Sequence, residues 1–315
     1  MQYKKLMTEF EEIIVELSYN CNLSCSMCGF GKEINPYSKS KFLTIENYKN
    51  ILHQIGDKTK TIRLNGRGES TIHPNFVEIL NYTKEKYPNV NINLFSNFSF
   101  NNKRILDALI KNQVQLFISM DSSEADELTA IRKGARFLYI EENIKRLNDL
   151  PNRPFIIFTI QETNIHRIYD IAKFAFDNNC QMLFNTIRRD EGIEPFIEIM
   201  NEQNQNISEQ FEKVTKLYAT STLQCLYPDQ LAGIQLKVNK PTQTYGTMKS
   251  CPALDKELCI FYDGTTTPCN MFNPYVYGNI FKQSLEEIWN SPERLEFLTS
   301  HKSHYYCQNC SNLGM

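Results

Sequence analysis

Short apolar runs alternate with amphipathic stretches between residues 11 and 187 of the chain. The strand-like runs are 11–18, 60–65, 90–96, 114–120, 154–160 and 180–187. Helical periodicity lies between them, at 44–55, 74–87, 101–112, 139–149 and 165–178. Thr44 and Asn102 are the residue types that cap helix N-termini, and each stands at the start of one of these stretches. Six repeats of a strand and a helix predict a parallel sheet with right-handed crossovers.

Polar residues gather where the predicted strands end. Parallel barrels place their sites at the carboxyl ends of the strands. The pattern therefore favours an α/β fold with a partial (β/α)6 TIM-like barrel over a flat doubly wound sheet. We expect this barrel to occupy residues 1–189, and a bridging segment with one helical pattern near 207–220 to occupy residues 190–250.

A small β-hairpin and helix domain is expected at residues 251–315. Asp263-Gly264 predicts the hairpin turn, because this dipeptide adopts the tight turns that join antiparallel strands. Ser284 followed three residues later by Glu287 predicts a capping box at the start of a helix.

Composition narrows the class of protein. Of the 315 residues, 41% are hydrophobic and 22% are charged, as in ordinary globular proteins. A net charge of −2 gives no electrostatic sign of nucleic-acid binding. The sequence shows neither a signal peptide nor an apolar run of membrane length, so we expect a cytoplasmic protein with no membrane partner. In a reducing compartment its ten cysteines should be metal ligands, reactive thiols or buried thiols rather than disulfides.

Three cysteines follow the first predicted strand, at Cys21, Cys25 and Cys28. Three thiolates can hold three irons of a 4Fe–4S cluster and leave the fourth iron open for chemistry. A zinc site or three unrelated core thiols are the alternatives, although structural zinc needs four ligands and no fourth Cys or His stands nearby. The Cys-x-x-x-Cys-x-x-Cys spacing on a strand-to-helix loop resembles the signature of the radical S-adenosylmethionine (SAM) enzymes. Met27 stands where that family usually has an aromatic residue.

The resemblance extends to the ends of the next strands. Gly66-Arg67-Gly68-Glu69 stands where the family carries a Gly-Gly-Glu-like motif, whose backbone and acid meet the SAM amino group. Glycines allow close approach of a ligand, and a carboxylate pairs with an ammonium group. Further matches are Ser96, Asn97, Ser119, Asp121 and Arg132. By resemblance, the hydroxyls and carboxylate suit the SAM ribose and Arg132 suits the SAM carboxylate. Taken singly, each could equally be a strand-end cap or a surface charge.

A second group of cysteines lies near the C-terminal end, at Cys251, Cys269, Cys307 and Cys310. Twelve residues separate Cys251 from Gly264 and four separate Gly264 from Cys269. With Tyr277-Gly-Asn-Ile280 and the final Cys-x-x-Cys, this pattern resembles the twitch/SPASM auxiliary domain of radical SAM enzymes. The sequence stops at Met315, so the resemblance is to the short type, in which four cysteines hold one auxiliary 4Fe–4S cluster. A structural zinc ribbon is the alternative.

The resemblance implies a function. The reduced N-terminal cluster would cleave SAM to a 5′-deoxyadenosyl radical, which removes a hydrogen atom from an unactivated carbon of the substrate; flavodoxin or ferredoxin would supply the electron. Because Cys21 stands so near the start, we expect no leader-binding domain and a small polar substrate, sugar-like or aminocyclitol-like. Peptide modification by epimerisation, thioether formation or cross-linking is the alternative, and a zinc-binding interaction protein is the non-enzyme alternative.

Two reaction types are open for the small substrate. In a dehydrogenation the auxiliary cluster would accept the second electron, and Glu162 and Arg188 at strand ends are candidate bases. In an epimerisation a free thiol would return a hydrogen atom to the substrate, and Cys225 in the bridging segment is the candidate donor. Cys180 and Cys259 are expected to be packed thiols.

Overall fold

The computed structural model describes residues 9–29, 41–147, 150–187, 194–227, 230–231, 234–235, 251–270 and 275–308. The core strands are β1 (Phe10–Val15), β3 (Thr59–Leu64), β4 (Asn91–Ser96), β5 (Gln115–Ser119), β7 (Phe155–Ile160), β8 (Gln181–Thr186) and β9 (Cys225–Leu226). The helices that accompany them are α1 (Ile45–Ile55), α2 (Phe76–Lys86), α3 (Lys103–Lys111), α4 (Ala125–Ile131), α5 (Phe137–Lys145), α6 (Ile168–Asp177) and α7 (Glu194–Tyr218). The C-terminal part contains β12 (Glu257–Ile260), β13 (Thr265–Thr267), β14 (Gly278–Asn279), α8 (Leu285–Trp289), α9 (Pro292–Ser300) and α10 (Tyr305–Gln308).

Several shorter elements complete the described chain. Two small antiparallel pairs are β2 (Ser24–Cys25) with β6 (Arg132–Lys133), and β10 (Gln230–Leu231) with β11 (Ile234–Gln235). Single 3-10 turns are η2 (Ser70–Ile72), η3 (Ile165–Arg167), η5 (Pro252–Leu254) and η6 (His301–Ser303).

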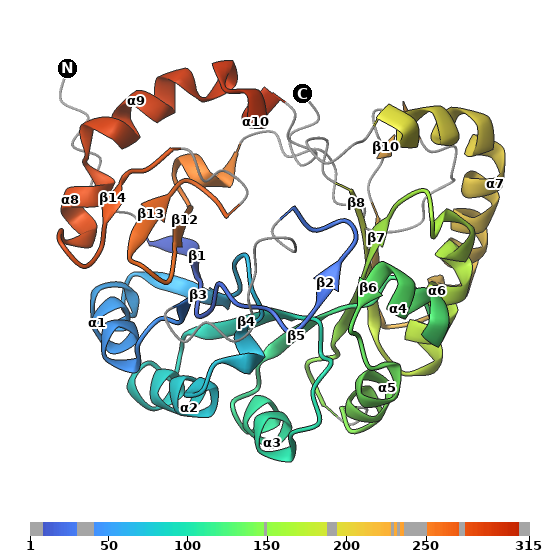
Figure 1. Cartoon of the computed structure of the whole chain (residues 1–315), viewed down its shortest axis with the longest axis horizontal. Helices are drawn as coiled ribbons and strands as arrows, with labels where there is room; N and C mark the ends of the chain where they lie inside the picture. The colour runs from blue at the N-terminus through green and yellow to red at the C-terminus, as the bar shows by residue number, and fades with distance from the viewer. Residues whose placement is uncertain are drawn as a thin grey trace.

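Ten strands form one continuous sheet in the order β14-β13-β12-β1-β3-β4-β5-β7-β8-β9. Every neighbouring pair from β12 to β9 is parallel, while β12–β13 and β13–β14 are antiparallel. Among the described strands the sheet stays open, with β14 and β9 at its edges. It curves into a horseshoe with α1 to α7 on the outside (Figure 1). The partial barrel predicted from the sequence is therefore confirmed.

The outer face of the sheet carries the main hydrophobic core. Ile13, Val15, Ile62 and Leu64 alternate along β1 and β3 and join one buried cluster with the apolar faces of the helices. The intervening residues point to the inner side, where Ile14, Cys259 and Phe261 form a separate small cluster. This alternation is the period of two that a strand imposes, so it assigns one face to packing and leaves the other for a site.

The inner side of the barrel has a polar wall and an aromatic wall. On the polar wall Arg63 pairs with Glu12 at 3.1 Å, and Asn93 donates to the same carboxylate at 3.1 Å. On the aromatic wall Phe95, Phe117 and Phe155 stack along β4, β5 and β7, with ring centroids 4.3 and 5.2 Å apart and interplanar angles of 6° and 7°. The inner side therefore combines charged and aromatic side chains, and Arg63 lies over the Phe95 ring at 5.3 Å.

Most element boundaries agree closely with the sequence pattern, although α4 was not predicted, and two further differences follow. Thr44 and Asn102 accept hydrogen bonds from the first turns of α1 and α3, and the capping box of Ser284 and Glu287 is present. Helix α7 begins at Glu194, well before the expected 207–220 pattern, because the polar run from Asn201 to Asn206 interrupts the apolar periodicity. In the described residues, no helix combines the length and the apolar character needed to cross a membrane.

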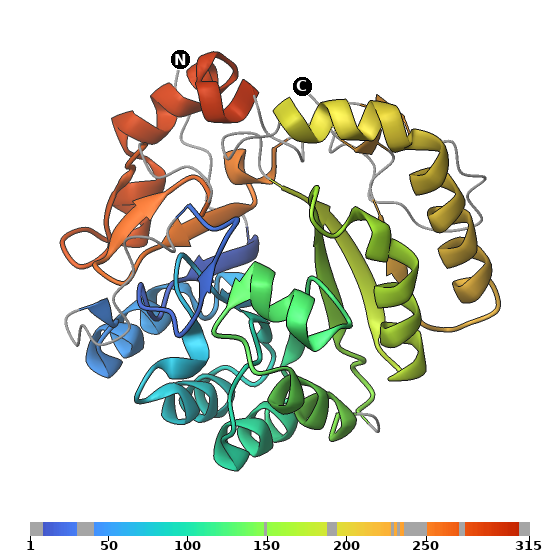
Figure 2. The ribbon, with the colours of Figure 1, turned by 45° about the vertical axis from the view of Figure 1, so that its right-hand side comes forward.

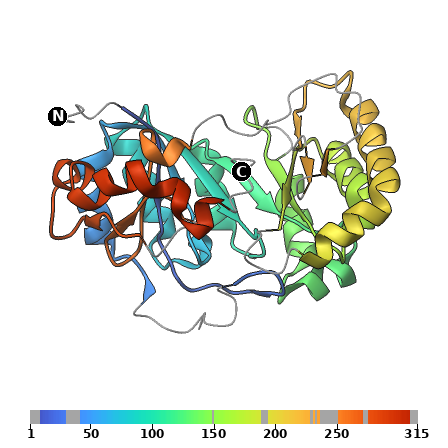
Figure 3. The ribbon, with the colours of Figure 1, turned by 90° about the horizontal axis from the view of Figure 1, so that it is seen from above.

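The second difference concerns the C-terminal hairpin, which is continuous with the barrel. Its first strand, β12, pairs in parallel with β1 in the register Ile14↔Cys259, so the hairpin extends the core sheet. Figures 2 and 3 show the hairpin and α9 at one end of the sheet and α7 at the other. The domain boundaries 1–189, 190–250 and 251–315 themselves stay predictions.

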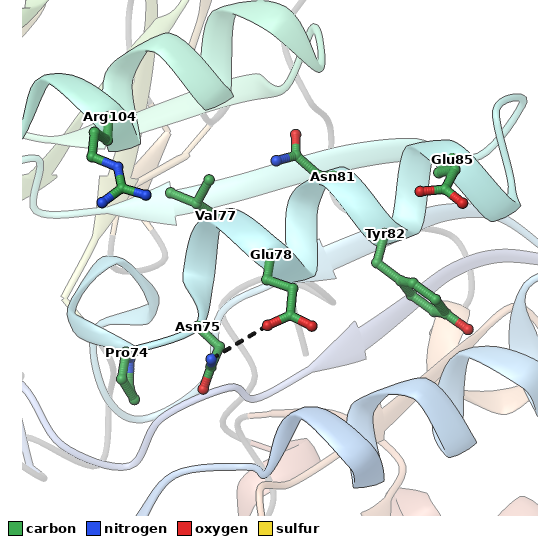
Figure 4. Close-up of a pocket in the computed structure, with 8 residues that line it drawn as sticks. All are labelled: Pro74, Asn75, Val77, Glu78, Asn81, Tyr82, Glu85 and Arg104. Atoms are coloured by element: carbon green, nitrogen blue, oxygen red, sulfur yellow. Dashed lines mark hydrogen bonds between the residues drawn. The ribbon is translucent and has the colours of Figure 1, made fainter.

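A shallow pocket of about 480 Å³ lies on the outside of the molecule, along α2. Figure 4 shows Asn75 donating to Glu78 within it, at 3.4 Å, with Arg104 of α3 at its border. None of the residues that line it was predicted as a site residue.

Arg67 links the hairpin to the barrel. Its side chain donates to both carboxylate oxygens of Glu16, at 3.0 and 2.7 Å, and its backbone N–H donates to Oε1 at 2.9 Å. The guanidinium stacks on Tyr19 of the cysteine loop at 4.4 Å and on Phe261 at 4.1 Å. Arg67 therefore joins β1, the cysteine loop and the end of β12, and it keeps a fully buried carboxylate paired.

We predict that Arg67→Met lowers the free energy of unfolding by about 3 to 5 kcal/mol, because it leaves the Glu16 carboxylate buried and unpaired. The measurement is urea unfolding of the reconstituted protein. Lys49→Met is the matched control: it breaks an exposed pair, Lys49–Glu78 at 3.0 Å, and should cost less than about 1 kcal/mol. Equal effects of the two substitutions would contradict the assignment.

Candidate active site

The cysteine loop lies across the carboxyl end of the parallel strands. Cys21 follows β1, and Cys25 in β2 pairs with Arg132 in β6 (Figure 1). The loop is fixed further by Ser26, whose N–H donates to the Ile131 carbonyl at 2.9 Å. Cys21, Cys25 and Cys28 are free and partly buried. Two distant segments, the first loop and the start of β6, thus hold the three thiols at the barrel mouth.

The chemistry of the three thiols suits an iron–sulfur cluster. Burial, together with the smaller effect of the Glu69 carboxylate, raises the pKa of Cys21 to about 12. Burial also raises the pKa of Cys25, against the opposing effect of Arg132. Iron binds thiolates, so cluster binding here is coupled to proton release.

Glu69 joins three segments at the barrel mouth. Its Oε1 accepts from Thr71 N, Thr71 Oγ1 and Ser96 Oγ at 3.0, 2.7 and 2.8 Å. Its Oε2 accepts from Asn97 N at 2.8 Å, and its own N–H donates to the Asn20 carbonyl at 2.8 Å. A carboxylate oxygen with one donor can accept another. Oε2 can therefore take the ammonium group that the sequence resemblance implies.

Asn97 connects the same network to the cysteine loop. Its Nδ2 donates to Asn22 Oδ1 at 2.8 Å and lies 3.9 Å from Cys21 Sγ. Its Oδ1 accepts from Ser99 N at 2.9 Å. The structure thus brings together Glu69, Ser96, Asn97 and Cys21, which come from three strand ends. Their contacts with SAM stay predictions.

Gly66 and Gly68 allow the second strand end to approach the first. A Cβ at Gly68 would lie 2.3 Å from the Asn20 carbonyl oxygen and 2.5 Å from the Ser18 carbonyl oxygen. A Cβ at Gly66 would lie 2.4 Å from Cγ of Glu16. Any side chain at Gly68 would therefore push the backbone of the cysteine loop away.

Asp121 and Arg132 form a buried pair beside Cys25. Arg132 Nε lies 2.7 Å from Asp121 Oδ2, and Arg132 Nη1 lies 4.0 Å from Cys25 Sγ. Asp121 is fully buried, and its Oδ1 accepts from Thr159 N at 2.8 Å. This geometry lets Asp121 position Arg132 toward the cysteine loop. The SAM contacts predicted for both residues are untested.

The other strand-end residues are more scattered. Ser119 is half-buried at the end of β5, and Glu162 is exposed in the turn after β7. Arg188 lies outside the described residues. The roles of Glu162 and Arg188 as bases stay predictions.

Cys225 is not brought to the barrel mouth. It stands opposite Met182 in the β8–β9 pair and packs against the main core, which includes Tyr218 and Tyr227. Burial raises the pKa of its thiol well above the ordinary value. The thiol therefore lies on the helix-covered side of the sheet, a placement that does not favour the predicted hydrogen-donor role. Cys259, in contrast, is a fully buried thiol on the inner side.

Three of the four C-terminal cysteines are described. Cys251, Cys269 and Cys307 are partly buried, while Cys310 lies outside the described residues. Cys269 follows β13, where Thr267 Oγ1 donates to the Cys269 carbonyl at 3.0 Å. Cys251 precedes η5, whose Leu254 N–H donates to the Cys251 carbonyl at 3.2 Å. The donor set is made of thiols alone, which suits an iron–sulfur cluster.

Sequence reasoning missed Glu16 and the role of Arg67. A glutamate at the end of an otherwise apolar strand run, Ile13-Ile14-Val15-Glu16-Leu17, was the available signal, because a buried carboxylate needs a partner. Nothing in the sequence named Arg67 as that partner.

Comparison with known families agrees with this architecture. The model of the radical SAM superfamily matches residues 15–175, and that of the SPASM iron–sulfur cluster-binding domain matches residues 251–311. The chain belongs to the radical SAM superfamily and carries a SPASM-type domain. It is a radical SAM enzyme whose cofactors are SAM and two iron–sulfur clusters.

Individual relatives extend over both domains. The chain is 27% identical over 288 residues to the antilisterial bacteriocin subtilosin biosynthesis protein AlbA of Bacillus subtilis (strain 168). That match covers 88% of this chain but 59% of AlbA, so the chain spans less than two thirds of this relative. SuiB of Streptococcus suis, solved with S-adenosylmethionine, has the same fold, with a TM-score of 0.67, 15% identity, and coverage of 98% of this chain and 72% of SuiB. BtrN, solved with AdoMet and 2-DOIA, has a TM-score of 0.55 and 15% identity, and the match covers 98% of this chain and 95% of BtrN.

We predict that Gly68→Ala weakens SAM binding tenfold or more, because the added methyl group forces the Asn20 and Ser18 carbonyls apart, and such overpacking costs about 1 to 3 kcal/mol. The measurement is equilibrium binding of SAM to the reconstituted protein. Gly56→Ala is the control, since its methyl group would meet only the Tyr87 ring, 2.4 Å away at the end of α1. Normal SAM affinity in Gly68→Ala would contradict this account of the loop.

Proposed function

We propose that this enzyme modifies a peptide in the biosynthesis of a peptide natural product, by hydrogen-atom abstraction from an unactivated carbon. The observation that carries the proposal is the 27% identity to AlbA, which extends over 88% of the chain. Epimerisation, thioether formation and cross-linking are the reaction types that start from such an abstraction.

The chain's own residues have distinct tasks in this proposal. When bound, SAM and the N-terminal cluster supply the hydrogen-abstracting chemistry. Glu69 Oε2 accepts the SAM ammonium group, and Arg132, held by Asp121, meets its carboxylate. Gly66 and Gly68 keep the backbone close enough for these contacts. An electron donor such as flavodoxin or ferredoxin would reduce the cluster.

The barrel interior supports a peptide substrate. The aromatic wall of Phe95 and Phe117 is partly exposed toward the interior and can hold an apolar side chain. Beside it, Arg63 lies over the Phe95 ring at 5.3 Å and pairs with Glu12, so donors and acceptors for a peptide backbone adjoin the aromatic rings. A substrate that is apolar on one side and polar on the other matches both walls.

A small polar substrate, sugar-like or aminocyclitol-like, is the second candidate. The observation that favours it is the charge on the polar wall, where Glu257 stands opposite Glu12 and burial raises its pKa. Dehydrogenation or epimerisation would be the reaction. Hydroxyl and amino groups of such a substrate would pair with these carboxylates.

We expect the reconstituted enzyme, with dithionite and SAM, to transfer deuterium from a deuterated peptide into 5′-deoxyadenosine. The peptides to test are those encoded beside the gene, with an aminocyclitol in a parallel reaction. The readout is mass spectrometry of nucleoside and substrate, and Cys21→Ala is the inactive control. Transfer from the aminocyclitol alone would overturn the peptide proposal.

The fate of the substrate in heavy water separates the reaction types. An epimerase leaves one solvent deuterium at an inverted centre, while a dehydrogenase removes two hydrogens. We predict that Cys225→Ala turns over at the normal rate, because this thiol packs in the main core beside Tyr218. Loss of solvent deuterium incorporation, with the substrate radical still formed, would instead restore Cys225 as the hydrogen donor.

A further inference from the structure

Tyr277 carries a buried hydroxyl that lacks an acceptor in the protein. The residue is 1% exposed and precedes β14 in the C-terminal hairpin. Its Oη atom is buried and has no hydrogen-bond partner among the described residues. Buried polar groups in native proteins are almost always hydrogen-bonded, and leaving one unpaired is unfavourable. A phenylalanine would fill the same space, so the hydroxyl points to a ligand.

The backbone directs Tyr277 toward the C-terminal cysteines. Its N–H donates to the Thr266 carbonyl at 2.8 Å, which places the residue beside β13, the strand that leads to Cys269. Burial is the main cause of the raised pKa of the Tyr277 phenol. The nearby thiols of Cys269 and Cys251 also raise this pKa. The ring is held at its edge by Phe297, with centroids 5.8 Å apart and planes at 70°.

Arg294 approaches the same phenol but cannot accept its proton. The Arg294 charge opposes the rise in the Tyr277 pKa, which places the guanidinium near the hydroxyl. Arg294 donates to the Leu254 carbonyl at 2.7 Å and to the Trp289 carbonyl at 3.0 Å. A guanidinium has donors and no acceptor. Arg294 therefore leaves the Tyr277 hydroxyl without an acceptor among the described residues, on a residue whose backbone lies beside the strand that leads to Cys269.

We propose that the Tyr277 O–H donates a hydrogen bond to a sulfur atom of the auxiliary iron–sulfur cluster and thereby raises its reduction potential. Reduction adds negative charge to the cluster, and a donor aimed at sulfur stabilises the more negative state. Groups that contact metal ligands from the next layer of the protein tune a metal site in this way. Arg294 has a positioning role, since it holds the Leu254 carbonyl in the turn that carries Cys251.

The test is Tyr277→Phe in the reconstituted full-length protein, followed by a redox titration monitored by electron paramagnetic resonance. We expect a more negative midpoint potential for the auxiliary cluster, with about a tenfold fall in the equilibrium constant for reduction, or about 59 mV for a one-electron couple. The N-terminal cluster is the internal reference, since SAM changes its signal alone, and its potential should not move.

Tyr275→Phe is the matched control. Tyr275 belongs to the same aromatic cluster, 6.4 Å from the Tyr277 ring, but its phenol interacts with Glu296 and Ser300. Its removal should leave both potentials unchanged. An unchanged auxiliary potential in Tyr277→Phe would overturn the proposal, as would equal shifts in the two variants.

Replacement of Tyr277 by fluorotyrosine gives a second test that keeps the hydroxyl. Fluorination makes the phenol a stronger donor, so the auxiliary potential should move in the positive direction, opposite to Tyr277→Phe. This variant decides the question if Tyr277→Phe fails to retain its cluster. No positive shift in the fluorotyrosine protein, with the cluster fully loaded, would then overturn the proposal.

Discussion

Strand β1 is the element on which the rest of the structure depends, because it is paired in parallel on both edges. One edge bonds to β3 and so to the barrel, while the other bonds to β12 and so to the C-terminal hairpin. Glu16 follows the strand directly, and its buried carboxylate pairs with Arg67 from the next strand end. The cysteine loop begins a few residues later. The positions of both cysteine groups therefore follow from the register of one strand.

The barrel mouth is organised by carboxylates that bridge segments. Glu69 accepts hydrogen bonds from two strand ends and donates its N–H to the cysteine loop. Asp121 joins β5, β7 and Arg132 in the same way. Each carboxylate is buried and satisfied by donors from different elements, so the site is preorganised before any ligand binds. A radical enzyme needs this rigidity, because a misplaced substrate would expose the wrong hydrogen atom.

The two cysteine groups are in different surroundings. The N-terminal thiols meet Glu69, Arg132 and the polar strand ends, which suits an open iron with a charged cofactor beside it. The C-terminal thiols meet an aromatic cluster that includes Tyr277 and Phe297, with Arg294 as a nearby cation. Low polarity and a few hydrogen-bond donors around a cluster affect its reduction potential more than they affect the position of a substrate. This contrast is consistent with chemistry at the first site and electron transfer or support at the second.

The sequence by itself determined the class of fold and the cysteine groups, because strand and helix periods and ligand spacings are local properties of the chain. It also placed Glu69 and Asn97 at strand ends, and the caps Thr44 and Ser284. It could not place β12 beside β1, since a parallel pairing between residues more than 200 positions apart leaves no local pattern. Only the tertiary structure turned Cys225 toward the helices, paired Glu16 with Arg67 and buried the Tyr277 hydroxyl without a partner among the described residues, because side-chain contacts between distant segments are decided by packing.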